Sequence, residues 1–138
     1  MTEPTKASFS VRRRNLILSS FVLTFVGLRL YLHMSPSSNF DVAGYNIHHL
    51  FTGLLLITFS AIPLILLNGR NRWIDIGCIV FGAGLSMALD EWVYLIVTDG
   101  SDASYLLPVS FWGGAIMILL VVALTLVLSI GKRPHNRP

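Results

Sequence analysis

The stretch GLSMALDEWVYLIV, Gly84 to Val97, is apolar except for two adjacent acids, Asp90 and Glu91. It belongs to an apolar run that extends from about Ile74 to Thr98. A run of about 20 apolar residues is long enough to cross the hydrocarbon core of a bilayer as a helix. This stretch therefore predicts a membrane span that carries two carboxylic acids.

Three further apolar runs of similar length lie on either side, at about Asn15 to Met34, Gly44 to Leu67 and Leu106 to Ile130. The 138 residues are 54% hydrophobic and 12% charged, which is not the balance of a soluble domain. A helix satisfies its own backbone groups in lipid, so four helical spans are expected. The sequence predicts an all-α, polytopic integral membrane protein whose residues 1–138 form one domain, a four-transmembrane-helix bundle.

The basic residues flank the spans. They form three clusters: Arg12 to Arg14, Arg70 with Arg72, and Lys132, Arg133 and Arg137. The two other loops contain Asp41, Asp99 and Asp102 but no Lys or Arg. The positive-inside rule predicts a multi-pass protein of the cell membrane (plasma or inner) with both termini, residues 1–14 and 131–138, as polar cytoplasmic tails. The net charge of +3 indicates no nucleic-acid partner, because the charge lies at span ends.

Small residues at helical spacing predict where helices meet. Gly84 with Ala88, and Ser110 with Gly114, are small-xxx-small pairs. Two stripes are expected to face the bundle interior: Gly77, Gly84, Glu91 and Thr98 in the third span, and Asn46, His49, Gly53 and Ser60 in the second. Asp90 points about 100° away from Glu91 on a helix. We therefore expect Glu91 and His49 to form the site directly, with Asp90 as a supporting or proton-holding partner.

Polar residues of three spans are predicted to share one layer. Arg29 and His33 lie near the outer end of the first span, His48 and His49 four and five residues into the second, and Asp90 and Glu91 seven to eight residues before Thr98. At about 1.5 Å per residue they fall within a layer roughly 10 Å thick in the outer half of the bilayer. An unpaired charge there is costly, so Arg29 is expected to pair with Asp90 or Glu91.

Imidazole and carboxylate groups together suit zinc, iron or manganese. The candidate ligands are His33, His48, His49, Asp90 and Glu91, although neither His-Glu-x-x-His nor Glu-x-x-His spacing is present. Glu91, Asp90 and Arg29 are the candidate catalytic groups. Asn46 and Tyr105 are the candidate cofactor- or ligand-binding residues, with helix capping and membrane-interface anchoring as their structural alternatives.

Three functions fit this pattern. The first is a metal-dependent membrane enzyme that acts on a lipid, quinone or small amphipathic substrate from the bilayer. The second is a non-catalytic accessory or scaffold subunit of a larger membrane complex or homo-oligomer, held by a buried salt bridge or ligating haem or pigment through a histidine. The third is an ion or proton transporter, for which the sequence shows neither an inverted repeat nor an inner polar cluster.

Overall fold

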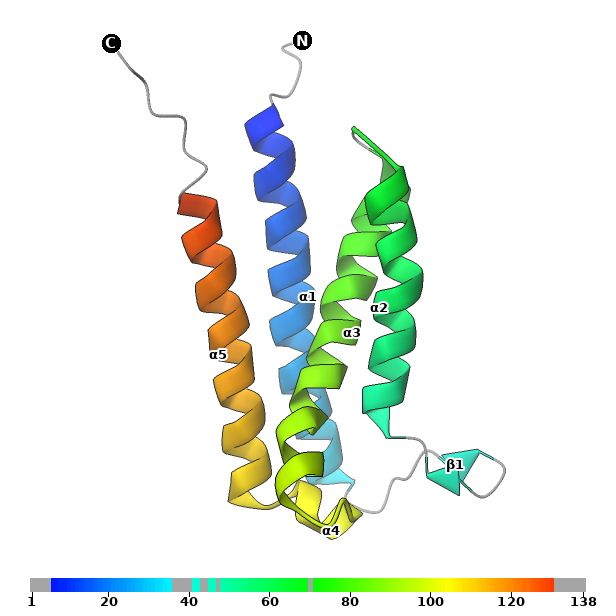
Figure 1. Cartoon of the computed structure of the whole chain (residues 1–138), viewed down its shortest axis with the longest axis vertical. Helices are drawn as coiled ribbons and strands as arrows, with labels where there is room; N and C mark the ends of the chain where they lie inside the picture. Colours follow the sequence, from blue (N-terminus) through cyan, green and yellow to red (C-terminus); the bar gives the residue numbers. More distant parts are fainter. Residues whose placement is uncertain (1–5, 36–40, 43–44, 47, 70, 131–138) are drawn as a thin grey trace.

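The computed structural model describes residues 6–35, 41–42, 45–46, 48–69 and 71–130. It consists of helices and one short hairpin (Figure 1). The helices are α1 (Lys6–Met34), α2 (His49–Leu66), α3 (Arg72–Val97), α4 (Asp102–Tyr105) and α5 (Pro108–Ile130), and the antiparallel strands are β1 (Asp41–Val42) and β2 (Tyr45–Asn46).

Four helices are long and apolar enough to cross a membrane. These segments are Ser10–Met34, His49–Leu66, Arg72–Val97 and Pro108–Ser129. Successive long helices run in opposite directions, so the start of α1 and the end of α5 lie at one end of the bundle, whereas α4 and the hairpin lie at the other (Figure 1). The helical part of the predicted fold class is thus confirmed.

The second span begins later than predicted. The sequence placed its start near Gly44, but Tyr45–Asn46 pairs with Asp41–Val42 as a hairpin, and α2 begins at His49 with His48 as its N-cap residue. The expectations that both histidines lie a full turn inside the helix, and that Asn46 shares a helical stripe with His49, were wrong. The physical reason is that Tyr45 and Asn46, which hydropathy had assigned to the span, pair with β1 in the hairpin instead.

Helix α3 is the centre of the bundle and packs against α2, α1 and α5. Its closest approach to α2 is at Gly53, where an added Cβ would lie 2.6 Å from the carbonyl oxygen of Gly84 and 2.7 Å from the amide nitrogen of Ala88. A Cβ at Gly77 would make ordinary contact, at 3.4 Å, with the Leu64 side chain of α2. The predicted role of this small-residue stripe as a helix contact is confirmed.

Helix α5 approaches α3 through glycine as well. A Cβ at Gly114 would lie 2.6 Å from Oδ1 of Asp90 and 3.2 Å from Nη2 of Arg29. Ser110, four residues earlier, is fully buried at the same contact. This small-residue pair brings the α5 backbone up to a buried charge.

Candidate functional site

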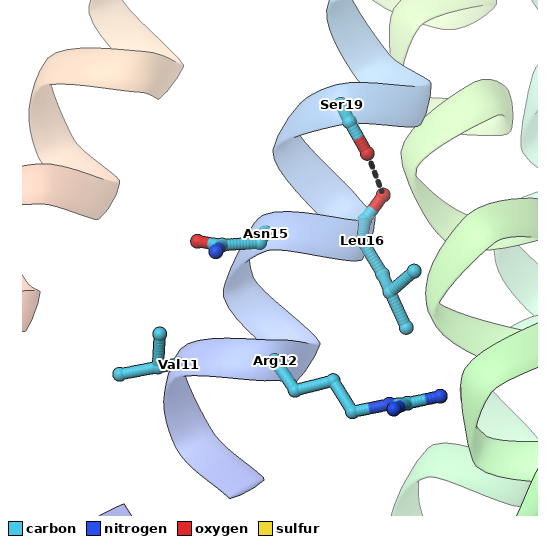
Figure 2. A pocket seen from close by; sticks show the side chains of 5 residues that line it. All are labelled: Val11, Arg12, Asn15, Leu16 and Ser19. Carbon is cyan, nitrogen blue, oxygen red and sulfur yellow. Dashed lines mark hydrogen bonds between the residues drawn. The ribbon is translucent and has the colours of Figure 1, made fainter. Parts of the chain in front are cut away.

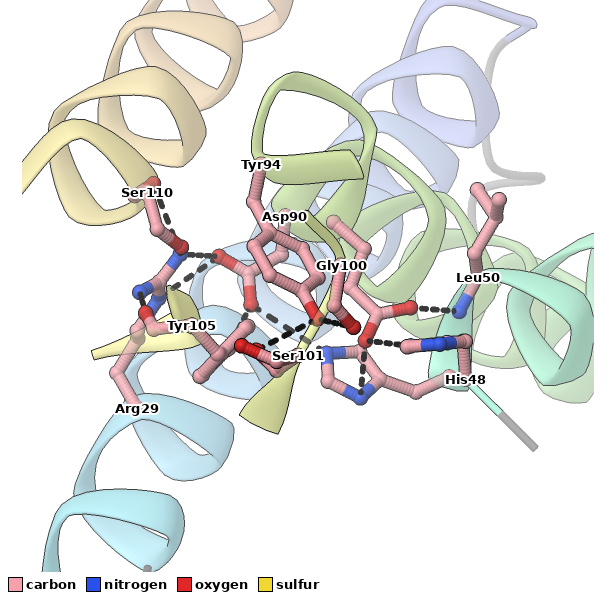
Figure 3. A network of polar contacts seen from close by, with 11 residues as sticks. Arg29, His48, Leu50, Asp90, Tyr94, Gly100, Ser101, Tyr105 and Ser110 are labelled. Carbon is pink, nitrogen blue, oxygen red and sulfur yellow. Dashed lines mark hydrogen bonds and ion pairs between the residues drawn. The ribbon is translucent and has the colours of Figure 1, made fainter. Parts of the chain in front are cut away.

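The two acids of α3 face different neighbours. Asp90 is directed toward α1 and α5 (Figure 3). Glu91 accepts a hydrogen bond from the Leu50 amide at the start of α2. Both are buried, with 0% of Asp90 and 3% of Glu91 exposed. The sequence had placed Asp90 outside the interior-facing stripe. Asp90 is nevertheless fully buried, because α3 has neighbours on three sides and adjacent residues can both be enclosed.

Arg29, Asp90, Tyr105 and Ser110 form what we call the locked half of the site. Nε and Nη2 of Arg29 donate to Oδ1 of Asp90 at 2.8 and 2.6 Å, and the Tyr105 hydroxyl donates to Oδ2. The guanidinium also donates to the carbonyl oxygens of Tyr105 and Ser110 at 3.2 and 3.0 Å. The predicted pairing of Arg29 with one of the acids is confirmed, and Asp90 is the partner.

Tyr105 covers this half from the end of the bundle that carries α4. Its ring centroid lies 4.2 Å from the Arg29 guanidinium carbon, within cation–π range. Burial, and then the negative charge of Asp90, raise the pKa of the Tyr105 hydroxyl above its ordinary value. The hydroxyl therefore stays protonated and serves as a donor to Asp90.

His48, His49, Glu91 and the amide of Leu50 form the histidine half. Oε2 of Glu91 accepts from the Leu50 amide at 2.7 Å, while Oε1 lies 3.2 Å from Nδ1 of His49 and 3.4 Å from Nδ1 of His48. The first amides of a helix have no intrahelical partner, and negative charge is favourable there. Since the His48 side chain makes no capping bond, Glu91 caps α2 from the neighbouring helix.

The imidazole of His49 lies between the two halves. Its Nε2 is 3.6 Å from Oδ2 of Asp90, too long for a hydrogen bond, and this buried atom has no hydrogen-bond partner among the described residues. The ring contacts Tyr105 edge-on, with centroids 5.4 Å apart. One nitrogen is thus directed to Glu91, and the other faces Asp90 without a hydrogen bond.

The loop that carries Tyr105 is held over the site. The Tyr94 hydroxyl donates to the carbonyl oxygen of Gly100 at 2.6 Å. Asp99 accepts from both the amide and the hydroxyl of Ser101, and from the Ser104 hydroxyl at 2.5 Å. These bonds, that of Ser104 foremost, lower the pKa of Asp99 to about 2. The loop is therefore tied to α3 through Tyr94 and held together internally by Asp99.

The remaining predicted ligands do not join the cluster. His33 is exposed on α1, and the contacts between described residues do not link it to either acid. The side chain of Asn46 lies outside the described residues. Across 6–35, 48–69 and 71–130, no three His, Cys, Asp or Glu side chains are arranged to hold a metal ion. The structure does not support the predicted metal centre, since Arg29 and Tyr105 engage both oxygens of Asp90.

Sequence reasoning missed several members of the site. The Leu50 amide could not be found, because its role depends on where α2 begins. Ser110 was recognised only as a small contact residue, although that contact is also where its carbonyl meets Arg29. The loop tether by Tyr94 had no signal in the sequence beyond a tyrosine in a span.

A second ion pair lies at the other end of the bundle, where no inner polar cluster was expected. Arg12 of α1 contacts Asp75 of α3, with Nη2 2.7 Å from Oδ2. Beside it is an open depression on the surface of α1, lined by Val11, Arg12, Asn15, Leu16 and Ser19 (Figure 2). The Ser19 hydroxyl there donates to the Leu16 carbonyl oxygen within its own helix. This pair joins α1 to α3 at a partly exposed position.

No protein-family model matches the chain, and no curated protein or solved structure shows significant similarity to it.

Proposed function

We propose that this chain is a multi-pass protein of the cell membrane with both termini in the cytoplasm. The arrangement of charges supports this orientation. Arg12 to Arg14 near the start of α1 and Arg72 at the start of α3 belong to one end of the bundle, and Asp99 belongs to the loop at the other, which has no Lys or Arg. In this orientation the site of Asp90 and Glu91 lies in the outer half of the bilayer.

The site binds a small amphipathic molecule, such as a lipid or a quinone, and exchanges a proton with it through His49. The observation that carries this proposal is the state of the His49 ring: Nδ1 faces Glu91 at 3.2 Å, while the buried Nε2 has no hydrogen-bond partner among the described residues. In acid–base sites a carboxylate orients one ring nitrogen and the other serves the reacting group. Partial exposure of both histidine side chains makes this half reachable.

A divalent metal, zinc, iron or manganese, is the variant of this proposal that the residue types suggest. It would use His48, His49 and Glu91 as ligands. Both Nδ1 atoms are directed at the same carboxylate oxygen, which suits an imidazole–carboxylate contact better than a shared metal. Acid–base chemistry without metal is therefore preferred, and elemental analysis of the purified protein tests the alternative.

A non-catalytic subunit of a larger membrane complex is the second candidate. The locked half favours the subunit candidate, because Arg29 and Asp90 neutralise each other's charge. Their remaining hydrogen bonds go to backbone carbonyl oxygens and to the side chains of Ser110 and Tyr105. Such a cluster holds α1, α3 and α5 together without any ligand. This candidate accounts for the locked half but not for the buried Nε2 of His49, which has no hydrogen-bond partner among the described residues.

Mass spectrometry of small molecules that co-purify with the protein separates the two candidates. His49→Gln and Glu91→Gln keep hydrogen-bonding groups in place, and the side-chain oxygen of the Glu91→Gln variant can still accept from the Leu50 amide, so both variants should remain folded and helical. We expect the wild type to carry a bound molecule that both variants lose, while the control Asp75→Asn retains it. Full retention by both site variants, or an empty wild type, would contradict the proposal.

A further inference from the structure

The end of the bundle that carries the start of α1 has an excess of positive charge. Its described residues include four arginines: Arg12, Arg13 and Arg14 of α1 and Arg72 of α3. Asp75 is the one acid among residues 6–15, 60–69, 71–80 and 125–130, the described residues nearest this end. Most of the positive charge therefore has no acidic partner in this part of the chain.

Arg14 is one of the arginines without an acidic partner among the described residues. Arg12 is paired with Asp75, and Arg13 donates to a backbone carbonyl oxygen just after α2. By contrast, Nε and Nη2 of Arg14 donate to a neutral group, Oδ1 of Asn15, at 3.2 and 3.1 Å. Because Oδ1 accepts both of these bonds, Asn15 keeps its Nδ2 N–H groups for a further partner. Arg14 and Asn15 thus present hydrogen-bond donors and one positive charge, which together suit an anion.

An open depression lies beside this pair on the surface of α1. Asn15 lines it together with Val11, Arg12, Leu16 and Ser19. Figure 2 shows Val11 and Asn15 directed away from Arg12, whose guanidinium reaches Asp75 of α3. The depression therefore opens on a side of α1 that the ion pair leaves exposed.

Beyond the depression, this side of α1 becomes apolar. The Ser19 hydroxyl donates to the Leu16 carbonyl oxygen at 3.2 Å, so its hydrogen-bonding requirement is met within its own helix. Val22 and Val26 continue the same side at three- and four-residue spacing, and both are exposed. Val26 lies about 18 Å along the helix from Arg14, a length comparable with one leaflet of a bilayer. A molecule seated here meets polar donors at one end and a hydrocarbon surface at the other.

We propose that this depression binds an anionic phospholipid. The phosphate oxygens accept from the Arg14 guanidinium and from Nδ2 of Asn15, and one acyl chain lies along Leu16, Ser19 and Val22. The charge of Arg14 favours an anionic head group over a zwitterionic one, because a zwitterionic head group carries its own cation beside the phosphate. The apolar surface beyond Ser19 favours a lipid over a free phosphate ester, which has no chain to place there.

The proposed orientation agrees with this ligand class. It places the arginines at the cytoplasmic leaflet, where anionic lipids are concentrated and each nearby Arg adds to the attraction. The lipid site is separate from the site of His49, because it lies at the opposite end of α1 from Arg29. Its lipid binds to the surface of the bundle, and none of its residues contacts the buried acids.

Three probes test the inference on the full-length protein in detergent micelles, with binding followed by native mass spectrometry. They are dioleoylphosphatidylglycerol, dioleoylphosphatidylcholine, and sn-glycerol 3-phosphate, which has the phosphate but no acyl chain. We expect saturable binding of the phosphatidylglycerol, at least about fivefold tighter than that of the phosphatidylcholine, and no measurable binding of glycerol 3-phosphate.

Two pairs of variants locate the binding. Arg14→Gln should weaken phosphatidylglycerol binding about fivefold, the contribution of one arginine near a membrane surface. Arg72→Gln is its matched control: it removes the same charge from the same end, but the Arg72 guanidinium lies against the Trp73 ring, away from the depression. Ser19→Phe should also weaken binding, because the ring fills the depression without changing any charge. Leu23→Phe, at an exposed position of α1 outside the depression, should not.

The outcomes decide between a built site and general attraction. Equal losses in Arg14→Gln and Arg72→Gln would mean that binding follows the total charge of this end, and would overturn the inference. Equal affinity for the two phospholipids, or tight binding of glycerol 3-phosphate, would overturn the ligand class. A Ser19→Phe variant that binds as the wild type does would remove the acyl chain from the depression and overturn the site. Phosphatidylglycerol binding that is lost in His49→Gln would assign the lipid to the other site, whereas unchanged binding supports a separate one.

The charge variants change exposed or half-buried side chains, so the bundle should remain folded in each. Helical circular dichroism of every variant checks this, and the comparison of Arg14→Gln with Arg72→Gln holds net charge constant.

Discussion

Removing Arg29 should destabilise the protein more than removing Arg29 and Asp90 together. Arg29 is 12% exposed and Asp90 fully buried, and Nη2 and Nε of Arg29 both donate to Oδ1. Arg29→Met leaves the carboxylate with the Tyr105 hydroxyl as its remaining side-chain donor in the locked half. Breaking a buried pair on one side costs about 3–5 kcal/mol, because the other charge stays buried without compensation.

The double variant, Arg29→Met with Asp90→Leu, removes both charges. Its main residual cost is the Tyr105 hydroxyl, which loses its acceptor at Oδ2. An unsatisfied buried donor costs about 1–3 kcal/mol. The double variant should therefore lose less free energy of unfolding than Arg29→Met alone, which is a non-additive result.

The measurement is reversible unfolding in mixed micelles, followed by helical circular dichroism as the fraction of denaturing detergent rises. Arg12→Met with Asp75→Leu provides the matched control. That pair has nearly the same separation, 2.7 Å between Nη2 and Oδ2, but its side chains are 47% and 25% exposed. Because solvent screens exposed pairs, the control should show much weaker coupling than the buried pair.

This reasoning would be refuted if, in the double-mutant cycle of Arg29 with Asp90, the losses in free energy of unfolding added up within about 0.5 kcal/mol. It would also be refuted by a control pair that couples as strongly as Arg29 with Asp90. The first result would mean that the acid is not held by the guanidinium in the membrane, and the second that burial does not set the strength of the pair.

Three further predictions concern packing, pH and topology. Gly53→Val should sharply lower the unfolding midpoint, because the valine side chain would overlap the backbone of Gly84. Gly27→Val is the control, since a Cβ at Gly27 meets nothing within 4 Å among the described residues. The hydrogen bonds of the Asp99 carboxylate in the loop should persist at pH 4 and weaken only toward about pH 2. The folded-state pKa of Asp99 is lower than its ordinary pKa, so the stability that these bonds contribute is present above the ordinary pKa and is lost as the pH falls through the folded-state pKa. An Asp99 carboxyl signal that titrates near pH 4 by NMR would contradict this. Ser101→Cys should react with an impermeant thiol reagent in intact cells, and protection there would reverse the proposed orientation.

Part of the site could be predicted from the sequence because it depends on position along a helix. Depth follows from residue number at about 1.5 Å per residue, so a shared layer of Arg29 and Glu91 could be expected from the span bounds, whereas the depth expected for His49 rested on a helix start that was wrong. The Arg29 pairing followed from the cost of an isolated charge. The choice of Asp90 as the partner did not follow, because it depends on which neighbour each side of α3 meets.

The sequence by itself determined the four spans, apart from the start of the second, and small residues that make helix contacts, such as Gly84 and Ser110. These follow from local quantities, namely apolar length and residue size at helical spacing. Only the tertiary structure decided that α2 begins at His49, that Glu91 caps it from α3, and that the acids divide between two halves of the site. The physical reason is that a side chain's partner is set by the helix packed against it, and that packing depends on the whole bundle.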